Sequence, residues 1–202
     1  AWPLTEFQSV RMGFAAQRSD LFTDPNSSSA EALYWVQNNG NTYTEVQNVG
    51  IPPIALTYYG TRFDTFEYSL GWSYDSRNRA LFADRGSRHR LSASYALPFS
   101  DIDFVSFNYD YLQFIPVSKW FTLMFNSEAG YGQALGDTTS MPPYRRFFAG
   151  GPETVRGYRE SRMGPKDSFG NPYGGNIKFT NQFELLLPMP AKWKNSARFS
   201  LF

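Results

Sequence analysis

The feature that most limits what this chain can fold into is an alternation of apolar and polar residues with a period of two. Between residues 66 and 74, for example, Phe, Tyr, Leu, Trp and Tyr alternate with Glu, Ser, Gly and Ser. Successive side chains of a β-strand point to opposite faces, so this pattern predicts a strand with one apolar and one polar face. The alternation is weaker at 10–16, recurs in full at 91–97, 105–111, 121–131 and 177–187, and begins again at 197–202.

The length and hydropathy of these segments favour an all-β membrane protein. No segment has a convincing helical period, and no apolar run reaches the ~18 residues that a membrane-spanning helix needs. Each full run is close to the roughly 9 to 11 residues with which a tilted strand crosses a bilayer. Because such a strand is apolar only at alternate positions, a mean hydropathy of -0.44 is compatible with a membrane β-barrel.

The two faces of the predicted strands distinguish a soluble sandwich from a membrane barrel. In a sandwich the apolar faces pack against each other, whereas in a membrane barrel they contact lipid and the polar faces line the lumen. Aromatic residues make up 18% of the chain, and some lie near strand ends, where membrane proteins place interfacial aromatic belts. The polar faces mix charged, amide and small residues with glycine, as a crowded lumen requires. We therefore expect an antiparallel up-and-down transmembrane β-barrel.

The connections between the predicted strands differ strongly in length. The first, about 20–62, and the fifth, about 134–175, are long, whereas the three between them are shorter. In an up-and-down meander the first and fifth connections leave the sheet at the same end. Outer-membrane barrels have long external loops and short periplasmic turns, and a sandwich gives no reason for this asymmetry. We expect residues 1–202 to form one partial outer-membrane barrel domain with these two external loops.

The fifth connection contains the most specific motif of the chain. A loop of this length is uncommon, and its aromatic residues and glycine pairs are unlike those of a disordered linker. It resembles the sixth loop of the BamA-type outer-membrane assembly factors, in which Gly-Gly-x-x-Thr-Val-Arg-Gly-aromatic is followed by Gly-Pro. The family usually has Phe where this chain has Tyr. The matching residues are Gly150, Gly151, Thr154, Val155, Arg156, Gly157, Tyr158, Gly164 and Pro165.

The resemblance extends over nearly the whole chain. Residues 3–11 resemble the entry to the family's seventh strand, residues 84–88 the turn into the ninth, and residues 174–176 and 184–188 the two ends of the twelfth. It implies an incomplete fragment of about six to seven strands from a sixteen-stranded barrel, without the periplasmic repeats, the strands of the lateral seam or the closing strands. Such a fragment would have two unpaired edges, through which we expect isolated copies to pair.

The N-terminus agrees with this expectation. It has no signal-peptide pattern and no initiator Met, so we expect the chain to begin partway through a longer protein.

The resemblance also implies a position for the fifth connection. In the family this loop folds into the lumen, and its arginine pairs with acidic residues of the inner wall. Glu184 lies on the polar face of its predicted strand, between Phe183 and Leu185, and is the partner that we expect for Arg156. A guanidinium in a narrow lumen needs a carboxylate, since an unpaired desolvated charge is costly.

Plainer interpretations of the same residues stay open. Arg156 could be a solvated loop arginine, and Glu184 could line the lumen without pairing to it. A second acidic partner that the family has is absent from this chain, so the pairing could be incomplete. Val155 and Tyr158 are expected to wedge the loop between side chains of the wall, and Gly157 is expected to allow close backbone approach.

The function that the resemblance implies is a non-enzymatic assembly factor of the bacterial outer membrane. It would fold and insert other outer-membrane proteins, while residues 134–175 brace the lumen. Its partners would be outer-membrane lipid, unfolded outer-membrane protein clients and accessory lipoproteins of the assembly complex. A two-partner secretion or TamA-like translocation barrel is the first alternative, and a passive porin-like channel is the second. A soluble sandwich enzyme is the remaining one.

The residues give little support for other chemistry. A net charge of +1 without a basic stripe argues against nucleic acid binding. With no cysteine and a single histidine, His89, we expect no metal site, no cofactor and no catalytic triad. Asp84, Asp101 and Asp103 are interpreted as turn residues instead of a general acid and base.

Overall fold

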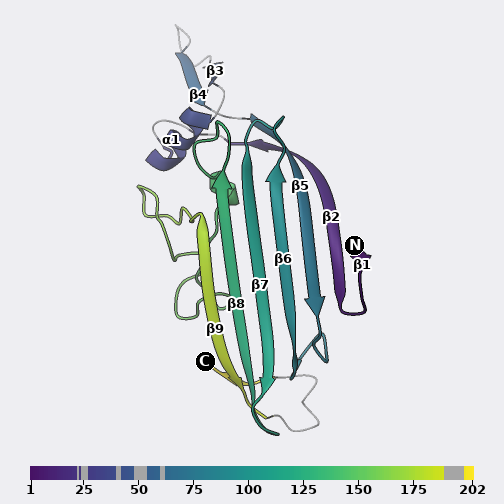
Figure 1. The fold of residues 1–202 in the computed structure, drawn as a ribbon. Helices are drawn as coiled ribbons and strands as arrows, with labels where there is room; N and C mark the ends of the chain where they lie inside the picture. The colour runs from purple at the N-terminus through teal and green to yellow at the C-terminus, as the bar shows by residue number, and fades with distance from the viewer. Residues whose placement is uncertain (22, 24–26, 40–41, 48–53, 60–61, 189–197) are drawn as a thin grey trace.

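One open antiparallel sheet contains most of the chain. The computed structural model describes residues 1–21, 23, 27–39, 42–47, 54–59, 62–188 and 198–202. Six long strands follow one another across the sheet, each antiparallel to the next (Figure 1). They are β2 (Gln8–Asp20), β5 (Arg62–Asp75), β6 (Gly86–Ala96), β7 (Phe104–Pro116), β8 (Thr122–Ala134) and β9 (Ile177–Leu186).

Two short strands complete the sheet at its margins. β1 (Trp2–Pro3) pairs with β2, and β10 (Ser200–Leu201) pairs with β9. The described residues of β1 and β10 do not pair with each other, so the sheet is open. The predicted all-β antiparallel meander is confirmed. Of the last predicted segment, residues 198–202 are described and include β10, whereas Ala197 lies outside the described residues.

The long connection between β2 and β5 contains structure that the sequence did not predict. Helix α1 (Ala30–Asn39) is followed by a hairpin of β3 (Thr42–Gln47) and β4 (Ile54–Tyr59). These elements lie at the upper end of the sheet, where the connection between β8 and β9 also leaves it (Figure 1). Both long connections are thus at one end of the sheet.

Helix α1 was not predicted because its apolar residues are consecutive. Residues 32–36 are Ala, Leu, Tyr, Trp and Val, a run that has no helical period. Only Trp35 and Val36 are buried, so contacts with the rest of the protein stabilise the helix more than an amphipathic stripe does. The expectation that no segment is helical was wrong at this point. No helix in the described part of the chain is long and apolar enough to cross a membrane.

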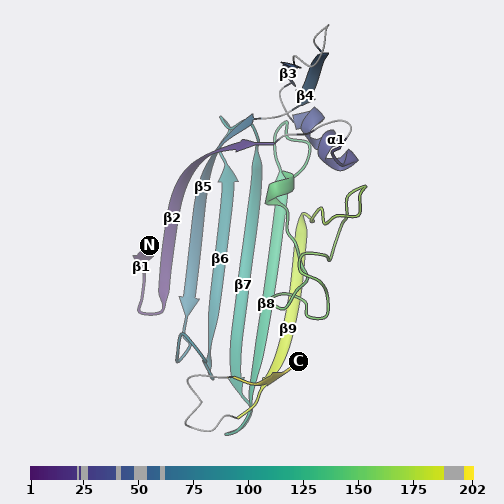
Figure 2. The ribbon, with the colours of Figure 1, turned by 180° about the vertical axis from the view of Figure 1, so that it is seen from behind.

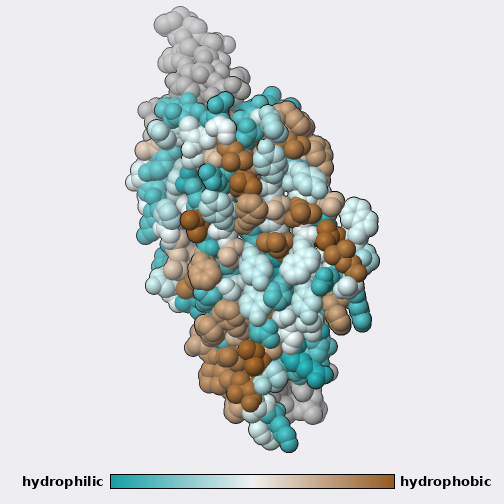
Figure 3. All heavy atoms as spheres, in the orientation of Figure 1, coloured by the Kyte–Doolittle hydropathy of each residue, from teal (hydrophilic) through white to brown (hydrophobic). Residues whose placement is uncertain are grey.

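One face of the sheet is apolar and exposed, and we call it the outer face. Residues paired across neighbouring strands share a face, so the register defines rows of side chains. Apolar and aromatic groups are prominent on this face in the space-filling view (Figure 3). One row consists of Val10, Trp72, Leu91, Tyr109, Ala129 and Phe179. An apolar surface of this width is suited to contact with lipid.

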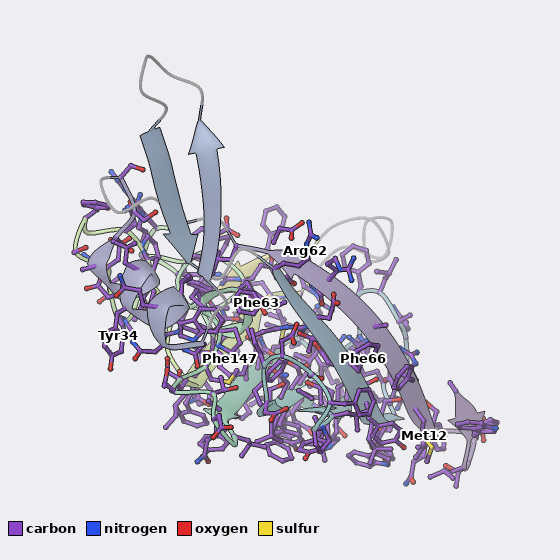
Figure 4. All side chains as sticks on the ribbon, turned by 90° about the horizontal axis from the view of Figure 1, so that it is seen from above. Met12, Tyr34, Arg62, Phe63, Phe66 and Phe147 are labelled. Atoms are coloured by element: carbon purple, nitrogen blue, oxygen red, sulfur yellow. The ribbon has the colours of Figure 1, made fainter. Side chains whose placement is uncertain are left out.

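The opposite face, the inner face, is polar and supports the loop between β8 and β9 (Figure 2). Seen from above, Phe63 and Phe147 lie well away from Met12, which belongs to the outer face (Figure 4). A buried cluster lies at each end of the sheet. The upper one contains Trp35, Val36, Phe63, Ala96, Ile102, Phe104 and Met141, and the lower one Ala83, Phe114 and Leu186.

The assignment of the two faces can be tested at adjacent residues in the middle of β6. Leu91 is on the outer face and 44% exposed, whereas Ser92 is on the inner face. We expect Leu91→Arg to lower the free energy of unfolding in lipid vesicles by about 2–4 kcal/mol, because it places a cation in hydrocarbon. Ser92→Arg should cost much less. Equal losses in a denaturant titration of the two variants would contradict the assignment.

Candidate functional site: the loop on the inner face

Residues 135–176, which connect β8 to β9, lie against the inner face (Figure 2). We call this segment the inner loop. Its regular element is the short 3-10 helix η1 (Pro143–Arg145). Antiparallel bridges between Phe147 and Gly175 and between Ala149 and Met163 fold the segment on itself. The inner loop is therefore an ordered structure with two branches.

Two glycines of β8 make room for the inner loop. A Cβ atom at Gly130 would lie 2.8 Å from the ring of Phe147, and one at Gly132 would lie 2.7 Å from the terminal methyl of Met141. The backbone of Phe147 exchanges two hydrogen bonds of 2.9 Å with Gly175, so its ring cannot retreat freely. The loop thus docks in a hollow that glycine provides. This hollow was not predicted from the sequence, although two glycines on one face of a strand are a signal for it.

The glycines of the predicted motif adopt conformations that favour glycine. The φ angles of Gly150, Gly151, Gly157 and Gly164 are 112°, 99°, 86° and 102°. Residues with a Cβ rarely adopt such angles. At Gly150 a Cβ would also lie 2.4 Å from the carbonyl oxygen of Arg159. The glycine pair therefore permits the tight approach of the two branches of the loop.

Thr154 and Pro165 each contribute to a turn of the inner loop. The Oγ1 of Thr154 accepts a hydrogen bond from the N–H of Gly150 at 2.8 Å and donates one to its carbonyl at 2.9 Å. The carbonyl of Pro165 accepts a hydrogen bond from the N–H of Tyr173 at 2.9 Å. These bonds fix the loop on either side of the predicted motif.

The structure brings Arg156 and Glu184 together. The Nη2 of Arg156 forms an ion pair with the Oε1 of Glu184 on β9. Glu184 is only 5% exposed, and the guanidinium of Arg156 lies 4.1 Å from the centroid of the Phe202 ring. A carboxylate this buried is unfavourable without a cation, so the pair links the motif firmly to the wall.

The aromatic residue of the motif lies elsewhere than expected. Tyr158 is 59% exposed and does not wedge between wall side chains of the described strands. Its carbonyl accepts a hydrogen bond from the N–H of Gly151 at 3.2 Å, so its backbone joins two parts of the inner loop and makes no contact with the wall in this bond. Val155 is half-buried and forms a bridge with Gly151.

Two adjacent arginines before the motif were not predicted as site residues. Arg145 forms an ion pair with Glu67 on β5. The Cζ of Arg146 lies 3.9 Å from the centroid of the Tyr173 ring, and burial lowers the pKa of Arg146 and raises the pKa of Tyr173. The sequence did contain one signal for the Arg145 pair, because Glu67 lies on the polar face of its predicted strand.

Helix α1 also contacts the inner loop. The Nε1 of Trp35 donates a hydrogen bond of 2.8 Å to the carbonyl of Ser140. Near the start of the helix, the N–H of Ser168 donates to the carboxylate of Glu31 at 2.9 Å, which lowers the pKa of Glu31. The two long connections are therefore joined at the start and in the middle of the helix.

Residues 2–202 match the family model described as the Omp85 superfamily domain. The chain belongs to the Omp85 superfamily. Among the residues that the structure describes, no group of three or more His, Cys, Asp or Glu side chains could hold a metal ion.

Two BamA proteins show how the Omp85 chain relates to known members. The outer membrane protein assembly factor BamA of Neisseria meningitidis serogroup B is 34% identical over 206 residues, which cover 99% of this chain and 24% of the relative. The crystal structure of BamA from Haemophilus ducreyi lacking POTRA domains 1-3 matches with a TM-score of 0.80 and 22% identity. That match covers 98% of this chain and 38% of the other.

These matches agree with the predicted family and location. The Omp85 chain spans about a quarter of the curated relative, and its fold is that of a BamA barrel segment. It is a protein of the bacterial outer membrane, as its sequence predicted.

The glycine hollow of the Omp85 chain can be tested with two alanine substitutions in one row of the sheet. Gly130 and Gly71 share a row of the inner face, but the nearest atom to a Cβ at Gly71 is 3.8 Å away. Gly130→Ala should cost about 1–3 kcal/mol of unfolding free energy, because the Phe147 ring is overpacked. Gly71→Ala should be neutral or slightly stabilising. The two variants should also differ in protease cleavage of the inner loop, and equal behaviour would contradict the hollow.

Proposed function

We propose that this Omp85 chain is part of an assembly factor that folds and inserts other outer-membrane proteins. In this proposal the inner loop braces the barrel from within. The observation that supports the brace is the ion pair between Arg156 and the buried Glu184, because it joins the motif to the wall. The assembly role is supported by the 34% identity to a protein named an outer membrane protein assembly factor.

The brace would hold the loop on the wall because the Glu184 carboxylate is buried and needs the Arg156 cation. If the loop left the inner face, Glu184 would lose the cation that Arg156 provides. Separating a fully buried pair costs about 3–5 kcal/mol, and the cost is smaller here because the Arg156 side chain is 30% exposed. A docked loop would therefore keep the wall in one shape while other strands of the protein exchange partners.

The proposed activity is not enzymatic, because no covalent step is needed to pair and insert strands. Unpaired strand edges would template client strands through main-chain hydrogen bonds, as in β-augmentation. The partners would be outer-membrane lipid on the outer face, unfolded outer-membrane protein clients and accessory lipoproteins. An ordered loop across the inner face also argues against a passive open channel.

We expect Arg156→Ala to destabilise the barrel and slow client assembly. The substitution leaves the Glu184 carboxylate without its partner, at a cost on the order of 2 kcal/mol. Barrel stability is measured by heat-modifiable gel mobility of the full-length protein, and assembly by the levels of client barrels in the outer membrane. Glu184→Gln should weaken the same interaction.

A matched control is available within the inner loop. Arg159 is an exposed arginine three residues after Arg156. Arg159→Ala should leave both mobility and client levels as in the unmodified protein. Normal mobility and client levels in Arg156→Ala would remove the brace from the proposal.

A further inference from the structure

A second ion pair fastens the inner loop near its start. The Nη2 of Arg145, in η1, pairs with the Oε1 of Glu67 on β5. The same nitrogen donates a hydrogen bond of 2.9 Å to the Oε1 of Gln17 on β2. The Arg145 guanidinium also lies 5.4 Å from the centroid of the Phe104 ring on β7. One arginine of the loop thus contacts three strands.

The ion pair between Arg145 and Glu67 differs from a surface ion pair because Glu67 is buried. Glu67 is 8% exposed and belongs to the few buried acidic residues of the described chain. A carboxylate removed from water needs a cation and further hydrogen bonds, and Arg145 is the cation that the structure places there. Detaching the start of the inner loop would remove from Glu67 the cation that pairs with it.

The two anchors are separated both along and across the sheet. Glu67 pairs with Ala96, the last residue of β6, toward the end of the sheet at which the two long connections leave, whereas Glu184 is near the lower end of β9. Three strands, β6, β7 and β8, separate them. Between the anchors, Phe147 fills the hollow over Gly130. The first branch of the inner loop therefore crosses the inner face diagonally and is held at both ends.

We propose that Arg145 and Glu67 are positioning residues that make the inner loop a diagonal tie across the wall. The inference deepens the proposed brace and rests on it. With one anchor the loop could pivot about Arg156, whereas two anchors fix both the loop and the spacing of β5 from β9. The Arg145 anchor thereby sets where the start of the inner loop reaches the wall.

A third ion pair of the inner face provides a contrast. Lys178 on β9 binds Glu128 on β8 at 2.6 Å. This pair joins adjacent strands and involves no residue of the inner loop. Removing it changes the charge of the inner face without releasing the loop, so it is a matched control.

The test uses the full-length protein in lipid vesicles with two spin labels on this chain. Cysteines introduced at Tyr144, beside Arg145 in the inner loop, and at Asn181, on β9, carry the labels, and the distance between the labels is measured by double electron–electron resonance. Both positions are exposed, and the chain has no cysteine of its own. We expect Arg145→Gln and Glu67→Gln each to lose the narrow distance peak of the unmodified protein. Glu128→Gln should retain it.

A variant in which the two charges are exchanged distinguishes a positioning role of the pair from a general loss of stability. Arg145→Glu combined with Glu67→Arg should recover part of the narrow peak that each single variant loses, because the pair is restored in reverse. A narrow peak in both glutamine variants would overturn the inference, and so would an exchange variant no narrower than the single ones. Glu67→Gln retains the shape of the carboxylate, so it removes the charge without opening a cavity.

Client assembly measured on the same variants distinguishes the two proposals. If Arg145→Gln releases the loop while client levels stay normal, the diagonal tie stands and the role of the brace in assembly fails. If the loop stays in place, the diagonal tie fails whatever the client levels are.

Discussion

Contact with lipid on one face of every long strand determines the chemistry of the other face. The apolar residues of the alternation face outward, so three acidic side chains near or within the middle of the strands point to the inner face. Glu67, Glu128 and Glu184 all lie there, each with a cation beside it. Two of these cations, Arg145 and Arg156, belong to the inner loop. The loop is thus part of the electrostatics of the wall.

Shape complements charge in the docking of the inner loop. Arginines hold the two ends of its first branch, and the Phe147 ring enters the hollow between them, where Gly130 has no side chain. A flat aromatic ring over a glycine backbone buries apolar area without a polar group to satisfy. Electrostatic pairing fixes the position of the ends, and the ring sets how closely the loop approaches the sheet. Each contact depends on the other.

The strands and the motif were predictable from sequence because their signals are local. Period-two alternation reveals which residues share a face, and it correctly placed Glu184 on the inner one. It does not reveal the height at which a loop meets the wall. Arg145 and Glu67 are 78 residues apart, and only the folded path of the loop brings them together. The position of Tyr158 escaped prediction for the same reason, since it follows from backbone contacts with Gly151.

The inner loop can dock only when the strands beneath it pair in the correct register. Glu184 lies between Phe183 and Leu185, so a shift of β9 by one residue would turn its carboxylate to lipid and an apolar side chain toward Arg156. A shift of β8 would likewise place Tyr131 where Gly130 accepts the Phe147 ring. The inner loop contacts β5, β8 and β9 together, and all three must be in register for it to dock. Docking therefore stabilises only the correctly paired sheet, which gives the loop influence over strand pairing beyond the few residues that it contacts.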